Sequence, residues 1–175
     1  VAGAICLDVG ASAGGFTDCL LQHGAAQVIA VDVGQGQLDW RLRQDARVTV
    51  IERLNARYLK EADLPARPSL AVIDVSFISL TLILPPVSAV LEPGGVLITL
   101  IKPQFEAGRD QVERGGVVRD PAVRQAVADR IRAFGEGQLG LAWRGLIESP
   151  LPGPAGNREW LAYWSKQGAM GTVPA

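Results

Sequence analysis

Short apolar runs rich in valine, isoleucine and leucine recur along the chain, and each is followed by glycine, asparagine, aspartate or proline. Runs that stay apolar, without alternating polar positions, are typical of strands buried on both faces of a sheet. The pattern therefore predicts five strands, at residues 4–9, 27–33, 47–51, 70–75 and 96–101.

Helical patterns lie between several of these strands, at residues 16–23, 79–91 and 121–134. The third has Asp120 at its capping position and Pro121 at its first helical position, where each residue type is favoured. Strands that alternate with helices favour an α/β fold with a doubly wound, mostly parallel sheet.

The last part of the chain has a different pattern. Residues 140–149 and 159–165 favour two further strands joined by the proline- and glycine-rich loop 150–156. They predict a hairpin-like pair that closes one edge of the sheet. The segment 106–116, with its glycines and charges, predicts a long mobile loop.

Polar residues stand where the predicted strands end. They are Asp8, Asp32, Asn55, Asp74 and Lys102. In an open α/β sheet, ligands bind beyond the carboxyl ends of the strands. We therefore expect these side chains to surround a ligand site at one edge of the sheet.

Composition and charge narrow the class of protein. The 175 residues fit one domain, and a hydrophobic content of 48% excludes a disordered chain. The 17 basic and 18 acidic residues nearly balance, so any nucleic-acid site must be local. Cys6 and Cys19 suit buried thiols of a reducing cytoplasm better than a disulfide framework, and nothing supports a metal site.

Neither a secretory signal nor a membrane span is expected. The chain enters its first strand without a basic leader region, which favours a cytoplasmic protein. The apolar run 75–91 approaches the length of a span, but Pro85 and Pro86 interrupt it and Asp74 and Glu92 bound it. We interpret the run as a buried loop and helix.

Glycines 10, 14 and 15 lie between the first strand and the first helix, where backbone can approach a ligand closely. The simplest interpretation is a tight turn that binds nothing. A second is a dinucleotide site, but its fingerprint needs a glycine at position 12, which is serine here.

The charge of Asp8 distinguishes between two candidate nucleotide-like ligands. In a dinucleotide site its carboxylate would face an anionic pyrophosphate, whereas in an S-adenosylmethionine site it would meet the methionine ammonium. Asp32 suits the ribose hydroxyls of either ligand. The carboxylate of Asp8 therefore favours S-adenosylmethionine.

Residues 10–14 also match G-x-S-x-G, the nucleophile elbow of α/β-hydrolases. A serine hydrolase needs a histidine base, normally late in the chain. The only histidine is His23, one helix beyond the turn, so this class lacks its base.

Five ordered motifs carry a more specific resemblance. They are DVGASAGGFTD at 8–18, IDVSFIS at 73–79, IKPQFE at 101–106, GGVVRD at 115–120 and GNRE at 156–159. Together they resemble the hemolysin A/TlyA family, whose methyltransferase domain is FtsJ-like. The resemblance implies a Rossmann-like fold with an antiparallel last strand, S-adenosylmethionine as methyl donor, and 2′-O-methylation of cytidine in ribosomal RNA.

The resemblance also implies site residues. Of the Lys-Asp-Lys-Glu set of FtsJ-like enzymes, Asp74, Lys102 and Glu159 match as catalytic residues. The first lysine lies upstream of the glycine turn in the family, in a helix that we expect to be missing here, as is the family's N-terminal S4-type RNA-binding domain. Residues 1–175 would then be the methyltransferase domain. The expected donor contacts are Asp8, Gly10, Ser12, Gly14, Gly15, Phe16, Asp32, Val33, Asn55, Ala56 and Asp74.

Each role has a simpler structural alternative. Lys102 would stabilise the developing alkoxide of the ribose, or else form only an ion pair. Glu159 would otherwise be a solvated strand residue paired with Arg158, and Asn55 an ordinary turn residue. Phe77 and Phe105 would stack on a flipped-out base, although core packing is the expectation that we favour.

Contacts to RNA phosphate are expected from arginines near Lys102, unless they are only solvated surface charges. They are Arg109, Arg114, Arg119 and Arg158. Ribosomal RNA or a ribosomal subunit is thus the expected partner. Two other classes remain: a nonenzymatic donor-binding or assembly module, and a membrane-lytic toxin, for which there is no cationic amphipathic helix.

Overall fold

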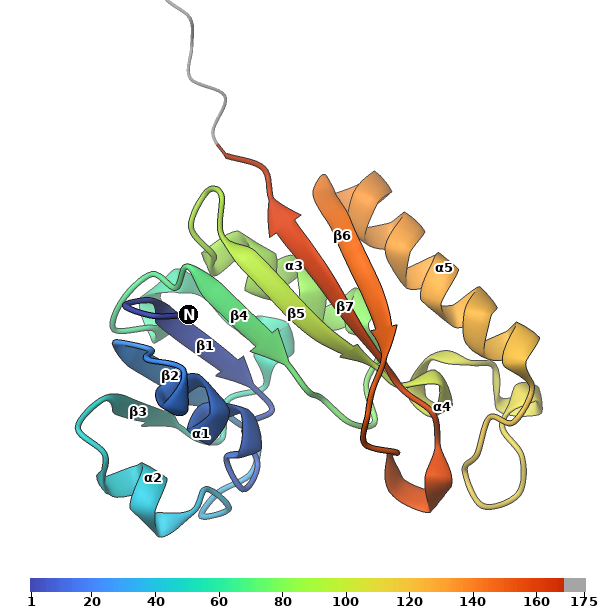
Figure 1. Cartoon of the computed structure of the whole chain (residues 1–175), viewed down its shortest axis with the longest axis horizontal. Helices are drawn as coiled ribbons and strands as arrows, with labels where there is room; N and C mark the ends of the chain where they lie inside the picture. The colour runs from blue at the N-terminus through green and yellow to red at the C-terminus, as the bar shows by residue number, and fades with distance from the viewer. Residues whose placement is uncertain (169–175) are drawn as a thin grey trace, which may run out of the picture.

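The computed structural model describes residues 1–168, which form a seven-stranded sheet with the order β3-β2-β1-β4-β5-β7-β6 (Figure 1). Strands β1 to β5 are parallel, and β7 runs antiparallel between β5 and β6. The strands are β1 (Ile5–Val9), β2 (Gln27–Val31), β3 (Val48–Ile51), β4 (Leu70–Ile73), β5 (Val96–Ile101), β6 (Leu141–Glu148) and β7 (Trp160–Lys166). The predicted mostly parallel sheet, with an antiparallel last strand, is confirmed.

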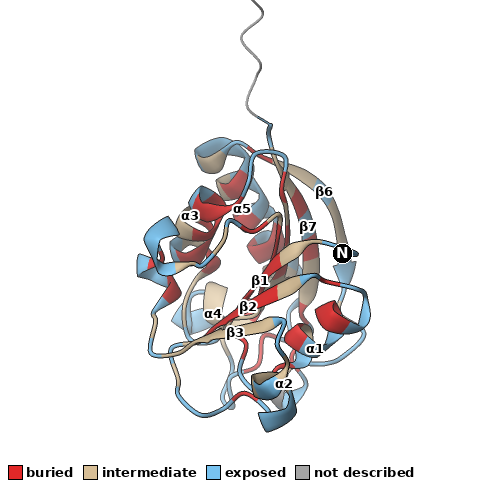
Figure 2. Cartoon of the chain, turned by 90° about the vertical axis from the view of Figure 1, so that its left-hand side faces the viewer, coloured by how far each residue is buried: buried red, intermediate tan, exposed pale blue. Residues whose placement is uncertain are grey.

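The helices lie on both faces of this sheet. They are α1 (Gly15–Gln22), α2 (Trp40–Gln44), α3 (Leu80–Val90), α4 (Pro103–Glu106) and α5 (Pro121–Leu139). Four 3₁₀ turns accompany them: η1 (Ala56–Tyr58), η2 (Glu61–Asp63), η3 (Arg109–Gln111) and η4 (Pro154–Gly156). Figure 2 shows α3 and α5 on one side of the strands and α1 and α2 on the other.

Helix α5 begins as the sequence predicts and ends later. The Asp120 carboxylate accepts a hydrogen bond from the Ala122 amide at 2.8 Å, and Pro121 is the first helical residue. The glycine-rich stretch after residue 134 stays helical because Gly135 packs on an aromatic ring. A Cβ there would lie 2.4 Å from the ring of Trp164.

The larger core fills the space between the sheet and the α3–α5 layer. Trp164 is fully buried in it; its indole N–H donates to the Thr99 hydroxyl at 3.0 Å and its ring meets Trp143 edge to face. A smaller core lies under α1 and includes Cys6 and Val72. Burial of each aliphatic side chain stabilises the fold by about 1.5–3 kcal/mol. The two cores therefore hold the strands in place, including the edge of the sheet at which the parallel strands end.

Several expectations need correction. The 106–116 segment is not one irregular loop: Glu106 closes α4, η3 follows, and Glu113 pairs with Val117 in a short bridge. Of the two thiols expected to be buried, Cys19 is exposed. Helices α2 and α4 are not predicted, because four or five residues offer too few periodic positions.

Within the apolar run 75–91, residues 80–90 form helix α3, which is largely buried and retains Pro85 and Pro86 inside it. The loop before it was expected to be buried, but Ser76 and Phe77 are exposed. Within residues 1–168, no helix is long and apolar enough to cross a membrane. The same residues contain no group of three or more metal-binding side chains placed to hold an ion.

Candidate functional site

The turn after β1 requires glycine at two positions. Gly10 has a φ of +83°, and a Cβ there would lie 2.2 Å from the carbonyl oxygen of Asp74 on the neighbouring strand. Gly14 has a φ of +103°, and its Cβ would lie 2.2 Å from the Leu42 side chain. The turn therefore lies directly against the end of β4, so that the Asp8 and Asp74 segments form one site.

Asp8 lies on the α1 face of β1 and is only 1% exposed. One of its oxygens accepts a 2.6 Å hydrogen bond from the Thr17 hydroxyl, and within residues 1–168 the other, Oδ1, has no hydrogen-bond partner. Burial raises the pKa of Asp8 to about 6, against the lowering effect of the Thr17 hydrogen bonds. Behind the glycine turn, the folded protein thus holds a buried carboxylate whose ionised form is destabilised by desolvation.

A cavity of about 610 Å³ opens at the carboxyl ends of β1, β2 and β4. Of the predicted donor contacts, it is lined by Gly10, Ser12, Asp32, Val33, Asn55, Ala56 and Asp74. The other predicted contacts, Asp8, Gly14, Gly15 and Phe16, do not line it. Its volume is in the usual range for a small-molecule site.

Two of the lining residues also hold the walls in place. Asp32 accepts hydrogen bonds from the Ser12 amide at 2.8 Å and the Gly34 amide at 2.7 Å. Asn55 accepts one from the Arg57 amide at 3.0 Å and so begins η1. Asn55 is therefore a turn residue, as the simpler interpretation expects, and a residue of the cavity wall as well.

Lys102 and Asp74 form the charged centre of the site. The Lys102 ammonium nitrogen lies 2.6 Å from Asp74 Oδ1 and donates to the Ser76 hydroxyl at 3.1 Å. The Lys102 side chain is 11% exposed and that of Asp74 32%, so one face of the pair is open to a substrate. The two residues follow the neighbouring strands β5 and β4, which explains their contact.

Glu159 lies beside this centre without an ion pair to it. The pairing of Ile101 with Trp160 places Glu159 next to Lys102 along the strands, but its carboxylate accepts a 2.8 Å hydrogen bond from the Gln104 amide. None of the salt bridges among the described residues joins Glu159 to Lys102. Glu159 is 4% exposed and Arg158 pairs with Glu148, so the solvated-residue alternative is wrong.

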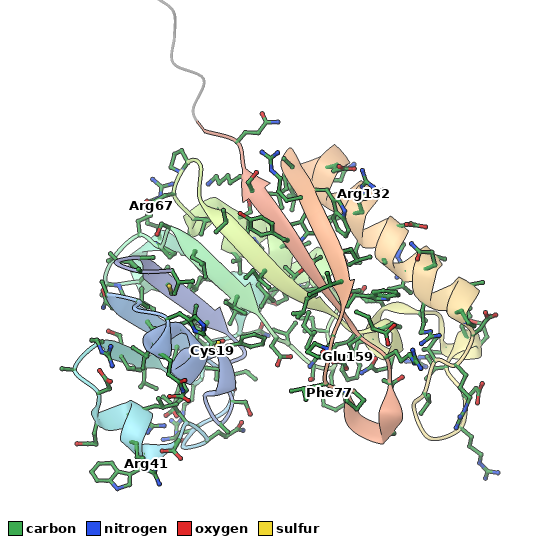
Figure 3. The ribbon with its side chains drawn as sticks, viewed as in Figure 1. Cys19, Arg41, Arg67, Phe77, Arg132 and Glu159 are labelled. Carbon is green, nitrogen blue, oxygen red and sulfur yellow. The ribbon has the colours of Figure 1, made fainter. Side chains whose placement is uncertain are left out.

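Phe77 projects from the loop between β4 and α3. It is 90% exposed, its φ is +63°, and its ring centroid is 4.8 Å from that of Phe105. Core packing, the expectation that we favoured, is therefore wrong for Phe77. Figure 3 shows Phe77 and Glu159 at the same end of the sheet.

The four candidate arginines divide into two groups. Arg119 pairs with Glu113 at 2.9 Å and Arg158 with Glu148 at 2.9 Å. Arg109 and Arg114 are exposed and form no salt bridge within the described part of the chain. Of the four, Arg109 and Arg114 are thus the two without a salt bridge among the described residues.

Sequence reasoning missed three residues that the structure brings to the centre: Ser76, Gln104 and Glu106. All three lie inside the motifs quoted above. Ser76 follows Asp74 by two residues, and Gln104 and Glu106 follow Lys102 by two and four. That closeness was the available signal, but their partners depend on pairing between distant strands.

With the geometry established, comparison with known proteins identifies the family. The profile of the FtsJ-like methyltransferase family matches residues 1–166. The chain belongs to the FtsJ-like methyltransferase family. Such methyltransferases depend on S-adenosylmethionine, and the G-x-S-x-G sequence in this FtsJ-like chain is part of its glycine turn.

The hemolysin A/TlyA resemblance is confirmed by curated relatives. The chain is 48% identical to the 16S/23S rRNA (cytidine-2′-O)-methyltransferase TlyA of Mycobacterium tuberculosis, covering 95% of this chain and 62% of the relative. It is 46% identical to Hemolysin A of Brachyspira hyodysenteriae, covering 91% and 67%. The chain spans about 60% of the length of the first curated relatives.

Solved structures agree with this FtsJ-like assignment. A Lactococcus lactis relative has a TM-score of 0.93 at 50% identity, covering 96% of this chain and 80% of that one. The N-methyltransferase NodS of Bradyrhizobium japonicum, in complex with S-adenosylhomocysteine, has a TM-score of 0.64 at 16% identity, covering 94% and 79%. The likeness to NodS shows the fold alone.

Proposed function

We propose that this chain is the catalytic domain of an S-adenosylmethionine-dependent ribose 2′-O-methyltransferase that acts on cytidine in ribosomal RNA. The observation that carries the proposal is the Lys102–Asp74 pair, 2.6 Å apart, whose Asp74 lines the cavity of an FtsJ-like chain. The activity printed for the TlyA relatives supplies the substrate class. A ribosomal substrate implies action in the cytoplasm. Residues 1–175 form the proposed domain, and residues 169–175 lie outside the described residues.

The residues around the cavity fit the proposed donor. Asp32 offers carboxylate oxygens to ribose hydroxyls, and Asn55 and Ala56 stand beside it on the wall. Asp8 does not line the cavity but lies buried behind the glycine turn, and its Oδ1, which has no hydrogen-bond partner within residues 1–168, fits a cationic ammonium better than a phosphate. When bound, S-adenosylmethionine supplies an electrophilic methyl group on a positively charged sulfur.

The chain's own chemistry centres on Lys102. A ribose hydroxyl is a weak nucleophile, so its oxygen must be held in line and its developing negative charge stabilised. The Lys102 ammonium can donate to that oxygen while Asp74 and Ser76 hold it in place. Glu159 adds a buried negative charge beside it, anchored by Gln104.

RNA contacts are proposed at the exposed side of the same centre. Phe77 presents its ring to solvent at the rim of the cavity, where a flipped-out base can stack on it. Arg109 and Arg114, which are exposed and form no salt bridge within residues 1–168, would contact phosphates. These contacts would position the ribose without reading the sequence.

Two measurements test the proposal. Calorimetry with S-adenosylmethionine and with NAD tests the donor, and binding of NAD alone would refute the donor site. Transfer of labelled methyl groups to ribosomal particles by the full-length gene product then tests the reaction. We expect Lys102→Ala to lower the rate at least about 100-fold, whereas Asp129→Asn, an exposed change on α5, should have no effect.

Other outcomes of these experiments would favour other functions. Donor binding without transfer by the full-length gene product would indicate a nonenzymatic binding module. Equal transfer by the wild type and Lys102→Ala would remove Lys102 from its role. Leakage of liposomes caused by the pure protein would support a lytic activity, the one suggested by the name of the Brachyspira relative.

A further inference from the structure

Glu106 is a buried carboxylate that has no part in the proposed chemistry. It is the last residue of α4, the short helix that follows Lys102 directly, and its side chain is 3% exposed. One oxygen accepts a hydrogen bond from the Leu80 amide at 2.6 Å, and the other accepts one from the Ser79 hydroxyl at 2.7 Å. Glu106 therefore connects the segment after β5 to the beginning of α3.

These contacts fasten the loop of residues 74–79 at both of its ends. Asp74 at one end contacts Lys102 at 2.6 Å, and Ser79 at the other end contacts Glu106. Between them, Phe77 has a φ of +63°, which is unfavourable for an aromatic residue, and is 90% exposed. Strained backbone of this kind persists only where its surroundings fix it.

Glu106 does more than cap α3: one oxygen accepts from the Leu80 amide, the first of the helix, and the other accepts from the Ser79 hydroxyl of the preceding loop. The Ser79 hydroxyl already accepts a hydrogen bond from the Thr81 amide and so caps the helix. Burial raises the pKa of Glu106, which means that its charged form is disfavoured where it stands. The Arg130 guanidinium forms an ion pair with Glu106 at 3.7 Å, but it is half exposed and offsets little of this cost. The burial of this carboxylate disfavours its charged form, and what its contacts provide in return is a fixed conformation of the 74–79 loop.

We propose that Glu106 is a positioning residue: it holds the 74–79 loop against the Lys102 segment, so that Asp74 meets the ammonium and Phe77 stays exposed at the rim. The inference rests on the proposed methyl transfer, because positioning matters only if a ribose must be aligned there. It adds a residue outside the Asp74, Lys102 and Glu159 set.

The test uses Glu106→Ala and Glu106→Gln in the full-length gene product, with Glu136→Gln as the matched control. Glu136 is an exposed carboxylate of α5 that pairs with Arg132. Hydrogen exchange across residues 76–80 measures the hold on the loop directly. Glu106→Ala should raise the exchange rate at least about 10- to 100-fold, because it removes two charge-assisted hydrogen bonds, and the loss of one alone has about this effect.

The second readout is the single-turnover rate of methyl transfer. The rate is divided by the number of protein molecules that bind S-adenosylmethionine, so that unfolded protein does not lower the measured rate. We expect Glu106→Ala to lower this rate about tenfold or more. Glu106→Gln should restore most of it, because its amide oxygen still accepts from Leu80. If Glu106→Ala fails to fold, Glu106→Asp, whose shorter side chain reaches the two contacts less well, should give a smaller change in the same direction.

The outcomes separate the two proposals. Unchanged exchange in Glu106→Ala would overturn the hold on the loop, whatever the activity. Faster exchange with an unchanged transfer rate would overturn the positioning role while the proposed function stands. A wild-type protein that transfers no methyl group would overturn the proposed function, and the inference with it.

Discussion

Replacing Asp8 with asparagine should stabilise the protein without ligand. Raising the pKa of Asp8 from 3.8 to about 6 costs the folded state about 3 kcal/mol above pH 6, at about 1.4 kcal/mol for each pKa unit. Asparagine removes the buried charge and can still accept from Thr17. At about pH 8 we expect a gain approaching 3 kcal/mol, which is about 6–12 °C in melting temperature.

The pH dependence identifies the cause of this gain. Because the folded pKa of Asp8 lies above the unfolded value, its favourable contribution is complete below pH 3.8 and is lost as the pH rises through about 6. The gain from Asp8→Asn should therefore shrink to less than about 1 kcal/mol near pH 4. Urea unfolding at several pH values measures it, and Asp129→Asn is the exposed control.

The same substitution should weaken donor binding if Asp8 has its proposed role, because the neutral amide lacks the charge proposed to meet the ammonium. A loss of at least about tenfold in affinity for S-adenosylmethionine is expected at neutral pH. A destabilised Asp8→Asn protein, or a gain independent of pH, would refute the argument from buried charge. Unchanged donor affinity would refute the role of Asp8 in binding.

Three further changes test the site. Gly10→Ala should destabilise the fold by more than about 2 kcal/mol in urea unfolding, because its Cβ would lie 2.2 Å from a backbone carbonyl oxygen at a positive φ. Gly153→Ala places a Cβ 2.1 Å from the Glu159 carboxylate. It should displace that carboxylate and lower the rate of methyl transfer about tenfold. Gly137→Ala, whose Cβ would lie in open space, should leave the rate unchanged. Phe77→Ala should change stability by less than about 0.5 kcal/mol and raise the KM for RNA about tenfold or more if a base stacks there.

The order of elements could be predicted because buried strands and capped helices leave strong local signals. Asp120 and Pro121 marked the start of α5, and the apolar run 96–101 coincides with β5. The antiparallel last strand followed from the family resemblance instead. The end of α5 was missed because the contact between Gly135 and Trp164 joins residues far apart in sequence.

The candidate site was predictable in its residues but less so in their contacts. The apolar runs placed Asp74 and Lys102 at strand ends, the family resemblance gave them a shared role, and the pairing of β4 with β5 explains their contact. The partner of Glu159 is Gln104, which could not be foreseen without the pairing of β5 with β7. The exposure of Phe77 depends on a loop fastened at both ends, which no local pattern encodes.

Nucleoside analysis of ribosomal RNA tests the central claim most directly. Unmethylated ribosomal particles would be incubated with S-adenosylmethionine and the full-length gene product, and the RNA digested and analysed by mass spectrometry. The account predicts 2′-O-methylcytidine with the wild type and almost none with Lys102→Ala. Methyl groups on a base, or equal yields from both proteins, would contradict it.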